Sequence, residues 1–568
     1  MPSDETAPIS TADGPPLAEG EGAFAEDSAP HRSRITAVGY PEGYQWRMTP
    51  VHVLPVQERL GTYAEVAQGY LTDEEARAEA ARCLLCKHPT CLSGCPNNNP
   101  IPTFLAFVQE GEILEAAVAD YEKNALAACT GRVCNWEAQC EGWCVLNANG
   151  EGVRIGAIER YIADYALRHP AALTALRGRR AAEEAVAGVS SYTRPDVSTY
   201  AAAIEAYGGM TVPGYASARE SVRLYTGASV PGYGPEDAPP ADLLLKGFRV
   251  AVVGAGPAGL ACADMLARNR AKVVVFEGLS YPGGILTDGI PEFVLPQAVV
   301  DREIGEIRAR GVEFRFGQFL SRDIHVTGLL EEFDAVFVGV GAETAHRLRI
   351  PGHDAAGVWV AQDFLRCAKR ALAPASAVER PVVGQRVLVV GAGDTAIDAA
   401  RTALRLGAVD VRIVYRRTRA ESPSRKVEVT LATEEGIRYE YLVDPVELLQ
   451  GGDGRVRGAR MQRMRLGAKD RSGRPRPEPL PDSEYELPCD AVIFAIGYAV
   501  HGADVERPRM LTPDGTVRTH GEGGGTEVPG LFAGGDVVRG AYTVVHAVRD
   551  GRLAADAIGD YLRRTRAS

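Results

Sequence analysis

Eight of the eleven cysteines in this 568-residue chain lie in one short stretch, between Cys83 and Cys144. They are spaced as Cys83-x2-Cys86-x4-Cys91-x3-Cys95, followed by Pro96, and as Cys129-x4-Cys134-x5-Cys140-x3-Cys144. Thiolates are soft ligands that suit iron–sulfur clusters, and close spacing lets a short segment reach several corners of one cluster. The first group has the ferredoxin pattern ending in Cys-Pro, in which the last cysteine serves the other cluster. The spacing therefore favours two [4Fe–4S] clusters.

Structural zinc and unligated core cysteines are the alternatives for this stretch. Zinc sites usually contain paired C-x2-C halves, and only Cys83 and Cys86 have that form. Iron–sulfur binding is therefore favoured, although zinc stays open at this point. The three isolated cysteines, Cys262, Cys367 and Cys489, are better explained as small buried hydrophobic residues.

A helix is predicted to lead into the first cysteine group. Thr72-Asp73-Glu74-Glu75 has the form of a capping box, and Ala76, Ala80 and Leu84 then recur on one face. We therefore expect residues 46–170 to form a helical domain that holds the clusters.

Glu159 lies on the apolar stripe of a second predicted helix. At helical spacing Ile155, Ile158 and Ile162 share this stripe, and Glu159 falls inside it. A buried carboxylate needs a partner or a metal. The periodicity alone slightly favours a buried salt bridge or an edge position, so both interpretations remain open.

A dinucleotide-binding pattern begins after Lys246. The apolar strand 249–253 leads into Gly254, Gly256 and Gly259, and a second strand ends at Glu277. The glycines permit a tight turn and close approach of a pyrophosphate, and an acid at the end of the second strand binds ribose hydroxyls. We expect an FAD-binding domain whose first part is residues 246–350.

The pattern recurs in the predicted NADPH-binding domain, residues 351–490. Strand 387–390 precedes a second glycine turn, whose expected cofactor contacts are Gly391, Gly393, Asp394 and Thr395. The second strand of this unit ends in Arg416 and Arg417, where an acid would otherwise lie. Arginine suits the 2′-phosphate of NADP. A solvated charge pair is the alternative.

The C-terminal region is predicted to return to the flavin domain. An apolar strand at 491–496 is closed by Gly497, and a later short strand ends in Gly535 and Asp536, which can hold a flavin ring or its ribityl chain at a helix start. Residues 491–568 are therefore assigned to the second part of the FAD domain. The predicted fold class is α/β, with two Rossmann-type domains, the NADP domain inserted in the FAD domain, and an α-helical iron–sulfur domain before them.

The bulk composition is that of a globular protein and excludes two function classes. Hydrophobic residues make up 45% and charged residues 24%, and the formal net charge of −12 would repel a nucleic-acid backbone. No apolar run approaches the roughly 18 residues of a membrane span. Residues 1–45 are predicted to be a disordered tail, and residues 171–245 a linker or insertion. We expect a cytoplasmic protein, since clustered cysteines in that compartment more often bind metal than form disulfides.

Taken together, these motifs resemble the small (beta) subunit of NADPH-dependent glutamate synthase. The resemblance rests on the cysteine stretch, on 155–162, on Gly283-Gly284-Ile285-Leu286, on Tyr415-Arg416-Arg417 and on Ala533-Gly534-Gly535-Asp536. The same module resembles the N-terminal part of dihydropyrimidine dehydrogenase and the large subunit of the electron-bifurcating transhydrogenase. It covers about residues 45–168 and 246–565. Two departures are Asn135, where the family usually has proline, and the long 171–245 segment.

The resemblance implies a ligand set for each cluster. One would use Cys83, Cys86, Cys91 and Cys144, and the other Cys95, Cys134, Cys140 and Glu159. Cys129 matches no ligand, and Gly284 and Leu286 match the flavin-binding segment. The resemblance thus favours Glu159 as a ligand over a structural carboxylate.

The implied function is electron input. NADPH, FAD and two [4Fe–4S] clusters would serve a large FMN-containing subunit in a hetero-oligomer, with FAD converting a two-electron hydride into single electrons. Hydride transfer between stacked rings needs no protein nucleophile, so no catalytic side chain is assigned. The alternatives are an input subunit for another acceptor, such as a pyrimidine reductase or ferredoxin, and a redox-sensing module without turnover.

Overall fold

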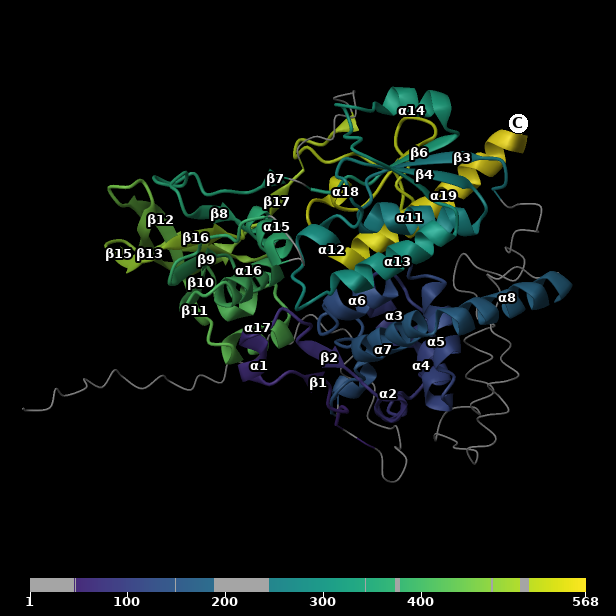
Figure 1. Ribbon diagram of the computed structural model, residues 1–568, viewed down its shortest axis with the longest axis horizontal. Helices are drawn as coiled ribbons and strands as arrows, with labels where there is room; N and C mark the ends of the chain where they lie inside the picture. Colours follow the sequence, from purple (N-terminus) through teal and green to yellow (C-terminus); the bar gives the residue numbers. More distant parts are fainter. Residues whose placement is uncertain are drawn as a thin grey trace, which may run out of the picture.

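The computed structural model describes residues 45, 47–148, 150–187, 245–342, 344–372, 378–470, 473–500 and 510–567. Figure 1 shows a helical domain at the lower right, a first sheet domain above it and a second sheet domain to the left. The predicted N-terminal tail, except Gln45, and most of the predicted insertion lie outside the described residues. Within the described residues, no helix is long and apolar enough to cross a membrane.

The helical domain packs its helices around small and aromatic residues. Its elements are β1 His52–Val53, α1 Val56–Leu60, β2 Ala67–Gly69, α2 Asp73–Ala80, α3 Thr90–Gly94, α4 Ile101–Glu110, α5 Ile113–Tyr121, α6 Ala127–Val133, η2 Val145–Ala148, α7 Ile155–Arg168 and α8 Pro170–Ala187. The predicted capping box is confirmed, because Thr72 and Glu75 each accept a hydrogen bond from the other's backbone amide. Helices α6 and α7 lie so close that a Cβ on Gly131 would be 2.7 Å from the backbone nitrogen of Arg160.

Helix α8 corrects the predicted domain boundary at residue 170. The range 171–245 was predicted to be a linker, yet α8 runs from Pro170 to Ala187 and packs on α5 and α7. Leu173 and Leu176 are buried in the core of the helical domain. The helical domain therefore continues into the range predicted as a linker, because this stretch presents apolar residues at helical spacing.

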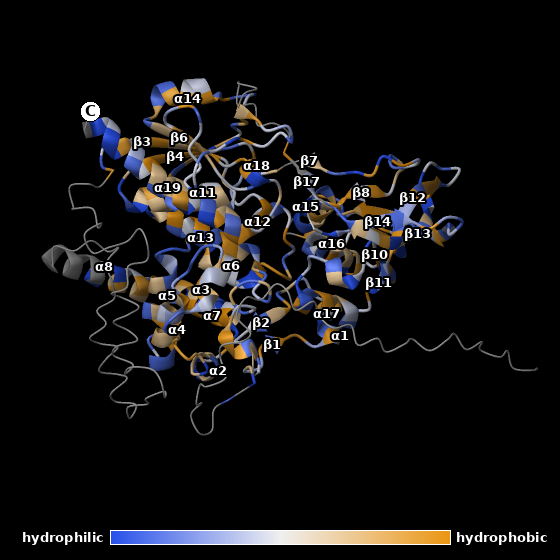
Figure 2. Ribbon diagram, turned by 180° about the vertical axis from the view of Figure 1, so that it is seen from behind, coloured by the Kyte–Doolittle hydropathy of each residue, from blue (hydrophilic) through white to orange (hydrophobic). Residues whose placement is uncertain are grey.

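The first sheet is parallel and has the strand order β18-β6-β3-β4-β5. Its strands are β3 Arg249–Val253, β4 Lys272–Glu277, β5 Glu313–Phe316, β6 Ala335–Val338 and β18 Leu531–Ala533. Its helices are α11 Pro257–Arg268, α12 Ile285–Asp288, α13 Gln297–Ala309, α14 Val326–Glu332, α18 Asp536–Arg539 and α19 Val544–Ala567. Figure 2 shows β3, β4 and β6 coloured as hydrophobic, as expected for parallel strands covered on both faces. The late strand β18 confirms that the chain returns to this sheet.

The second sheet is also parallel, with the order β11-β10-β9-β16-β8. Its strands are β8 Val358–Val360, β9 Arg386–Val390, β10 Asp410–Tyr415, β11 Arg438–Tyr441 and β16 Ala491–Phe494, and its helices are α15 Ala361–Leu372, α16 Asp394–Arg405 and α17 Lys426–Glu434. A short helix η4 Arg419–Glu421 lies between β10 and α17, and an antiparallel extension adds β12 Val443–Gln450, β13 Val456–Lys469, β14 Pro475–Pro479 and β15 Tyr485–Pro488.

The boundary predicted between residues 490 and 491 is wrong. Strand β16 pairs with β9 and β8 of the second sheet, whereas the prediction assigned it to the flavin domain. The crossing back occurs just afterwards, where β17 (Tyr498–Ala499) pairs with β7 (Thr344–Ala345). The second sheet domain is therefore inserted into the first through one two-stranded ribbon.

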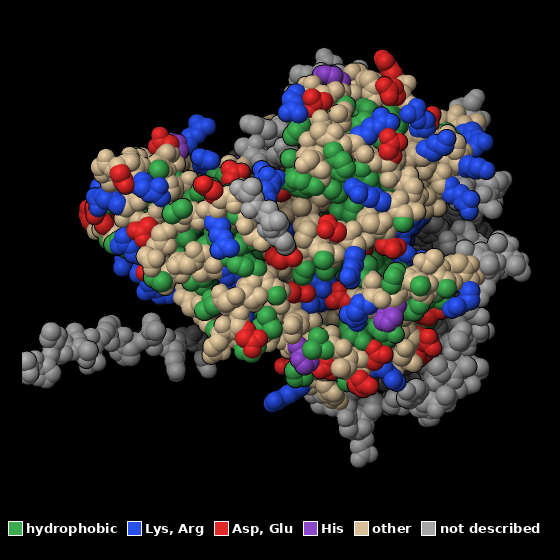
Figure 3. Space-filling view, viewed as in Figure 1, with side chains coloured by type: hydrophobic (Ala, Val, Ile, Leu, Met, Phe, Trp, Pro, Cys, Tyr) green, Lys and Arg blue, Asp and Glu red, His purple; other side chains and the backbone are tan. Residues whose placement is uncertain are grey.

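Charge is distributed evenly over the face seen in Figure 3. Lys and Arg side chains are interspersed there with Asp and Glu. The net charge of −12 is therefore not gathered into one acidic patch on this face.

Candidate functional site

The first predicted cysteine set lies between α2 and η2. Cys83 and Cys86 follow α2, Cys91 lies in α3, and Cys144 directly precedes η2; all four are half-buried. Burial raises the pKa of the Cys83 thiol well above its usual value, and the charges of Cys86, Cys91 and Cys144 raise it further. The four thiols are therefore close enough to interact electrostatically.

The second predicted set is assembled from three helices and a loop. Cys95 ends α3, Cys134 ends α6, Cys140 lies in the following loop and Glu159 lies on α7. Burial raises the pKa of the Cys140 thiol, and further contributions come from Glu141 and then from Cys95, Glu159 and Cys134. Cys134 and Cys140 are each only 6% exposed. The structure thus brings together the four groups of this set.

Glu159 is buried and is held through one oxygen. Its Oε1 accepts hydrogen bonds from Asn124 Nδ2 at 2.8 Å, Thr130 Oγ1 at 2.9 Å and Asn99 Nδ2 at 3.3 Å. Burial raises the pKa of Glu159 to about 7. Among the described residues, no Lys or Arg pairs with Glu159 and no hydrogen bond reaches Oε2, so a buried salt bridge does not explain this carboxylate.

The three residues that hold Glu159 were not predicted from the sequence. Asn124 and Thr130 carry no local pattern that marks them as partners of a residue so much further along the chain. Asn99 had a weak signal, because it closes a run of three asparagines directly after Cys95-Pro96. Its backbone amide also donates to Cys95 Sγ at 3.4 Å.

The types of ligand in the two sets favour iron–sulfur clusters. Within the described residues, no three His, Cys, Asp or Glu side chains meet closely enough to bind one metal ion. Zinc draws its four ligands around one centre, whereas a four-iron cluster takes one thiolate at each of its separate corners. Seven soft thiolates in two sets therefore suit iron–sulfur clusters, and Glu159 is the one hard ligand.

The remaining cysteines are structural, with one correction. Cys129 is buried in the core shared by α6 and the first sheet domain, away from both ligand sets. Cys262 and Cys489 are buried, as predicted. The prediction is wrong for Cys367, which is half-buried on α15 because it lies off the buried stripe of that amphipathic helix.

The first glycine turn has the geometry of a dinucleotide site. Gly254 has φ +100°, and a Cβ there would lie 2.5 Å from the Gly339 oxygen. A Cβ on Gly259 would lie 1.9 Å from the Gly254 oxygen, so this glycine permits close helix–strand packing. Glu277, at the end of β4, accepts a hydrogen bond from the Ala255 amide at 2.8 Å. Burial raises the pKa of this carboxyl.

Three distant segments meet at this turn without bulky side chains. A Cβ on Gly284 would lie 3.0 Å from Gly256 Cα, and a Cβ on Gly535 would lie 2.9 Å from Ala258 Cβ. Leu286 is buried beside them. Asp536 begins α18, and burial raises the pKa of its carboxyl to about 6. This backbone-lined cradle at the carboxyl end of β3 fits a flavin dinucleotide.

The second glycine turn lies at the carboxyl end of β9. Gly391 has φ +126°, and a Cβ there would lie 2.2 Å from the Ala495 oxygen, whereas Gly393 has no atom within 3.4 Å of its Cβ position. Asp394 begins α16 and accepts hydrogen bonds from the backbone nitrogen of Arg425 at 3.0 Å and from its Nε at 3.3 Å. Thr395 makes a side-chain hydrogen bond with Tyr498.

The two arginines after β10 differ in their surroundings. Arg416 is exposed, and no hydrogen bond or ion pair of its side chain occurs among the described residues. Arg417 is buried, donates from Nε to the Pro475 oxygen at 2.9 Å and pairs with Asp470 at 3.5 Å. Only Arg416 is therefore available to a nucleotide phosphate.

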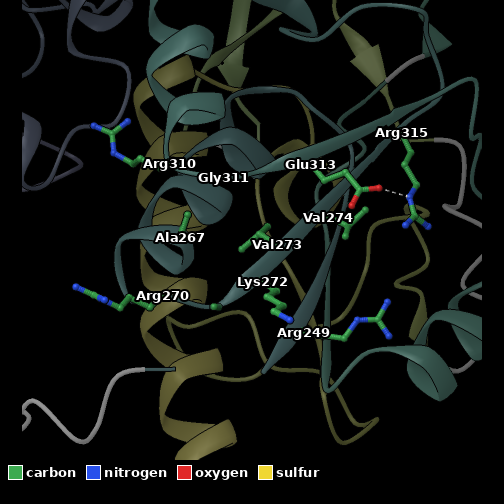
Figure 4. Close-up of a pocket in the computed structure, with 11 residues that line it drawn as sticks. Arg249, Ala267, Arg270, Lys272, Val273, Val274, Arg310, Gly311, Glu313 and Arg315 are labelled. Carbon is green, nitrogen blue, oxygen red and sulfur yellow. Dashed lines mark hydrogen bonds and ion pairs between the residues drawn. The ribbon is translucent and has the colours of Figure 1, made fainter. Parts of the chain in front are cut away.

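A basic pocket of about 560 Å³ lies at the opposite end of the first sheet. It is lined by residues at the amino ends of β3, β4 and β5, and Figure 4 shows Arg249, Arg270, Lys272, Arg310 and Arg315 pointing in different directions from it. Ligands of such sheets bind at the carboxyl ends of the strands. This pocket is therefore separate from both glycine turns.

The fold and site define a class of protein. One parallel dinucleotide fold inserted into another, after a cysteine-rich helical domain, is the arrangement of a flavin-dependent pyridine nucleotide oxidoreductase with an iron–sulfur module. The family model described as dihydropyrimidine dehydrogenase domain II, 4Fe-4S cluster, matches residues 59–171. That of the pyridine nucleotide-disulphide oxidoreductases matches residues 248–551.

Relatives narrow the family further. The glutamate synthase (NADPH) small chain of Halomonas elongata is 37% identical over 518 residues, covering 89% of this chain and 95% of that protein. The Escherichia coli small chain is 35% identical over 521 residues, covering 89% of this chain and 96% of that protein. The NADP(+)-dependent formate dehydrogenase subunit beta of Moorella thermoacetica is 35% identical over 476 residues, covering 84% of this chain and 60% of that protein. The chain belongs to the family of NADPH-dependent flavin and iron–sulfur oxidoreductases that contains the glutamate synthase small chains.

Proposed function

We propose that this chain is the NADPH-oxidising subunit that feeds electrons, through FAD and two [4Fe–4S] clusters, to the large FMN-containing subunit of glutamate synthase. The observation that carries the proposal is the pair of separate four-ligand sets in a domain packed against the flavin fold. FAD, when bound, supplies the conversion between a hydride and single electrons. The reducing cytoplasm would keep the thiols available as ligands.

The chain's own residues divide the remaining tasks. Five glycines leave room for the flavin pyrophosphate, namely Gly254, Gly256, Gly259, Gly284 and Gly535. The Cys83 set and the Cys95 set hold the clusters. Glu277 is placed for a ribose, and Leu286 and Asp536 flank the flavin cradle. Gly391, Gly393, Asp394 and Thr395 form the nicotinamide nucleotide turn. Arg416 binds the 2′-phosphate, and Arg417, through its contacts with Pro475 and Asp470, fixes the end of β10 beside it.

The contacts between domains support an order for the two clusters. Arg552 of α19, in the flavin domain, donates to the Asn97 side chain at 3.1 Å, two residues after Cys95. The set containing Cys95 therefore lies on the flavin side and would receive electrons first. The half-exposed Cys83 set would pass them on, and Trp143, 46% exposed beside Cys144, would lie at the partner contact.

A second acceptor is supported by one specific relative. The formate dehydrogenase subunit beta shares this module at 35% identity, so the module also occurs in a protein with a different name and function. An input role for another acceptor, such as a pyrimidine reductase or ferredoxin, is therefore the alternative. The experiment must distinguish it from electron input to glutamate synthase.

The test is cofactor analysis followed by reconstitution. Anaerobically purified protein should contain one FAD and about eight iron atoms per chain, and NADPH should reduce an artificial dye. The chain alone should make no glutamate from glutamine and 2-oxoglutarate, and adding the large subunit should restore glutamate formation. Iron near half that value, zinc in place of iron, or glutamate formation by the single chain would overturn the proposal.

Nucleotide preference is tested at Arg416. Arg416→Ala should raise the KM for NADPH by about tenfold or more, as expected for loss of a charge-assisted phosphate contact, and leave the KM for NADH nearly unchanged. Exposed Arg419→Ala, on the neighbouring short helix, is the matched control. Equal effects on both nucleotides would show that Arg416 is only a surface charge.

A further inference from the structure

Arg425 connects the second sheet domain to the loop that carries Cys134 and Cys140. It directly precedes α17, and its side chain is only 4% exposed. Its Nη1 donates to the Arg132 oxygen at 2.9 Å, and its guanidinium lies over the Trp136 ring at 5.7 Å. Arg425 therefore reaches the backbone and an aromatic ring on either side of Cys134, almost three hundred residues away in the sequence.

The same guanidinium also pairs with Asp394 at the nucleotide turn and with Glu428 of α17, 3.2 Å away. Arg425 Nε lies 3.3 Å from Asp394 Oδ2, and the Arg425 amide donates to Oδ1. Asp394 stands at the start of α16, where the phosphates of a bound dinucleotide are expected. An unpaired carboxylate there would repel those phosphates, so the Arg425 charge keeps the turn receptive to an anion.

A second contact holds the same two regions together. The Glu137 carboxylate accepts hydrogen bonds from the backbone amides of Lys426 at 2.9 Å and Val427 at 3.2 Å, and so caps α17 from the helical domain. Trp136 packs on α7, since a Cβ on Gly156 would lie 2.1 Å from its Nε1. The cysteine loop is therefore fixed between α17 and the helix that carries Glu159.

Buried ion pairs make α16 and α17 one unit. Arg401 of α16 pairs with Glu428 of α17 at 2.7 Å and with Glu435 at 2.7 Å, and Arg405 pairs with Glu435 at 2.8 Å. All of these side chains are buried. These buried ion pairs thus hold α16 and α17 together.

We propose that Arg425 is a positioning residue that links nucleotide binding at Asp394 to the redox state of the cluster held by Cys95, Cys134, Cys140 and Glu159. The link rests on the proposed function. An electron added to a cluster held by these residues would be stabilised by the same cation that pairs with Asp394. Nucleotide binding would therefore be weaker when the cluster is reduced. This would favour release of NADP+ after the electrons of NADPH have reached the cluster.

The test measures binding of 2′-phospho-ADP-ribose, which has the phosphates of NADP but no nicotinamide to react. Its dissociation constant is determined anaerobically for oxidised protein and for protein reduced with dithionite. We expect about tenfold weaker binding to the reduced wild type. By reciprocity the ligand should lower the cluster's midpoint potential, followed by electron paramagnetic resonance, by about 59 mV for one electron.

Arg425→Met should remove the difference between the two redox states, and Lys426→Met, which deletes an exposed cation one residue further on, should keep it. Asp394→Asn should also remove the difference and lies outside the cysteine loop, so it decides the matter if Arg425→Met loses its cluster. A wild-type difference retained in Asp394→Asn or Arg425→Met overturns the link.

The proposed function is judged separately on the same wild-type preparation, by its iron and FAD content and dye reduction. Wild-type protein with full cofactors but equal affinities in both redox states overturns the link alone.

Discussion

The two ligand sets share one small domain but occupy opposite environments. The Cys83 set is half-exposed and lies beside an exposed tryptophan. In the other set Cys95 is half-buried, whereas Cys134, Cys140 and Glu159 are buried, and both sheet domains contact residues next to Cys95 and Cys134. Each set takes cysteines from both groups of the sequence, so spacing along the chain does not distinguish the two sets. Ligand spacing therefore prepares a chain to bind a cluster, while the position of the set in the fold decides what the cluster can exchange electrons with.

The buried set also lies among carboxyl groups that burial makes weak acids. Glu303 of α13 accepts hydrogen bonds from the Ala128 amide at 2.7 Å and from Tyr121, and burial raises its pKa to about 8. Both oxygens of Asp120 are buried without a hydrogen bond, and burial, then Glu159 and Glu303, raise its pKa. One such carboxyl also acts on the Cys83 set, because Glu141, whose pKa burial raises to about 7, contributes to the raised pKa of the Cys144 thiol. Asp120 and Glu303 thus lie near the second ligand set as carboxyls with raised pKa.

The largest expected effect comes from deleting one cysteine of each set. Cys140→Ser and Cys86→Ser should each lose about half of the iron, because each removes a ligand from one cluster. Cys140→Ser should also lower the thermal midpoint more, since its loop contacts α17. Iron analysis and calorimetry measure both effects.

Cys129→Ala is the matched control for these variants, being buried in the same domain but in neither set, and should keep full iron. Equal loss of stability in the two serine variants would contradict the difference drawn between the sets.

The next effect is expected at Glu159. Glu159→Ala should lose or labilise only the buried cluster, with the Cys83 cluster and FAD retained, because three thiolates leave one corner of that cluster open. Glu159→Gln, which keeps an oxygen at the site, should retain iron with a changed potential. Iron content and low-temperature electron paramagnetic resonance of the reduced variants decide this.

Asp164→Asn, on the same helix but outside the set, is the control. Full iron and an unchanged spectrum in Glu159→Ala would make Glu159 a structural carboxylate.

A smaller effect is expected in the rate of metal removal. An iron chelator should bleach the wild-type protein in two phases, with the half-exposed Cys83 cluster lost first, because its thiolates are accessible to solvent. In Cys86→Ser the fast phase should be absent and the slow phase unchanged. A single phase in the wild type would show that exposure does not distinguish the two sets.

The smallest effect is expected in the pH dependence of stability at Glu303. Its folded pKa, about 8, lies above its ordinary value of 4.5, so the folded state binds more protons between these limits and stability falls as pH rises through this window. The contribution is at most about 1.4 kcal/mol per pH unit. Glu303→Gln keeps both hydrogen bonds and removes the titration, so its thermal midpoint should fall less between pH 6 and 8.

Asp301→Asn, an exposed position on the same helix, should behave as the wild type. An unchanged pH dependence in Glu303→Gln would show that Glu303 is ionised in the folded protein.

The sequence predicted the parts of the site that are local in the chain. The glycine turns, the Thr72 capping box and the strand before each turn have patterns of a few residues and were found. Strand β16 was assigned to the wrong sheet, because buried parallel strands are apolar throughout and carry no mark of their partners. The role of Arg425 was invisible for a related reason: its contacts lie in two other stretches of the chain, and no spacing rule joins them.

The ribbon of β7 and β17 has a consequence for the history and redesign of this molecule. The inserted domain begins and ends on two strands that pair with each other, so its ends lie roughly 4.8 Å apart. A unit joined in this way is a cassette: it can be exchanged for another nucleotide-binding domain, or replaced by a tight turn, while β6 and β18 keep their places side by side. Substitution of one contiguous gene segment would therefore change the electron donor, provided that the new domain also reproduces the contacts of Arg425 and α17 with the cysteine loop.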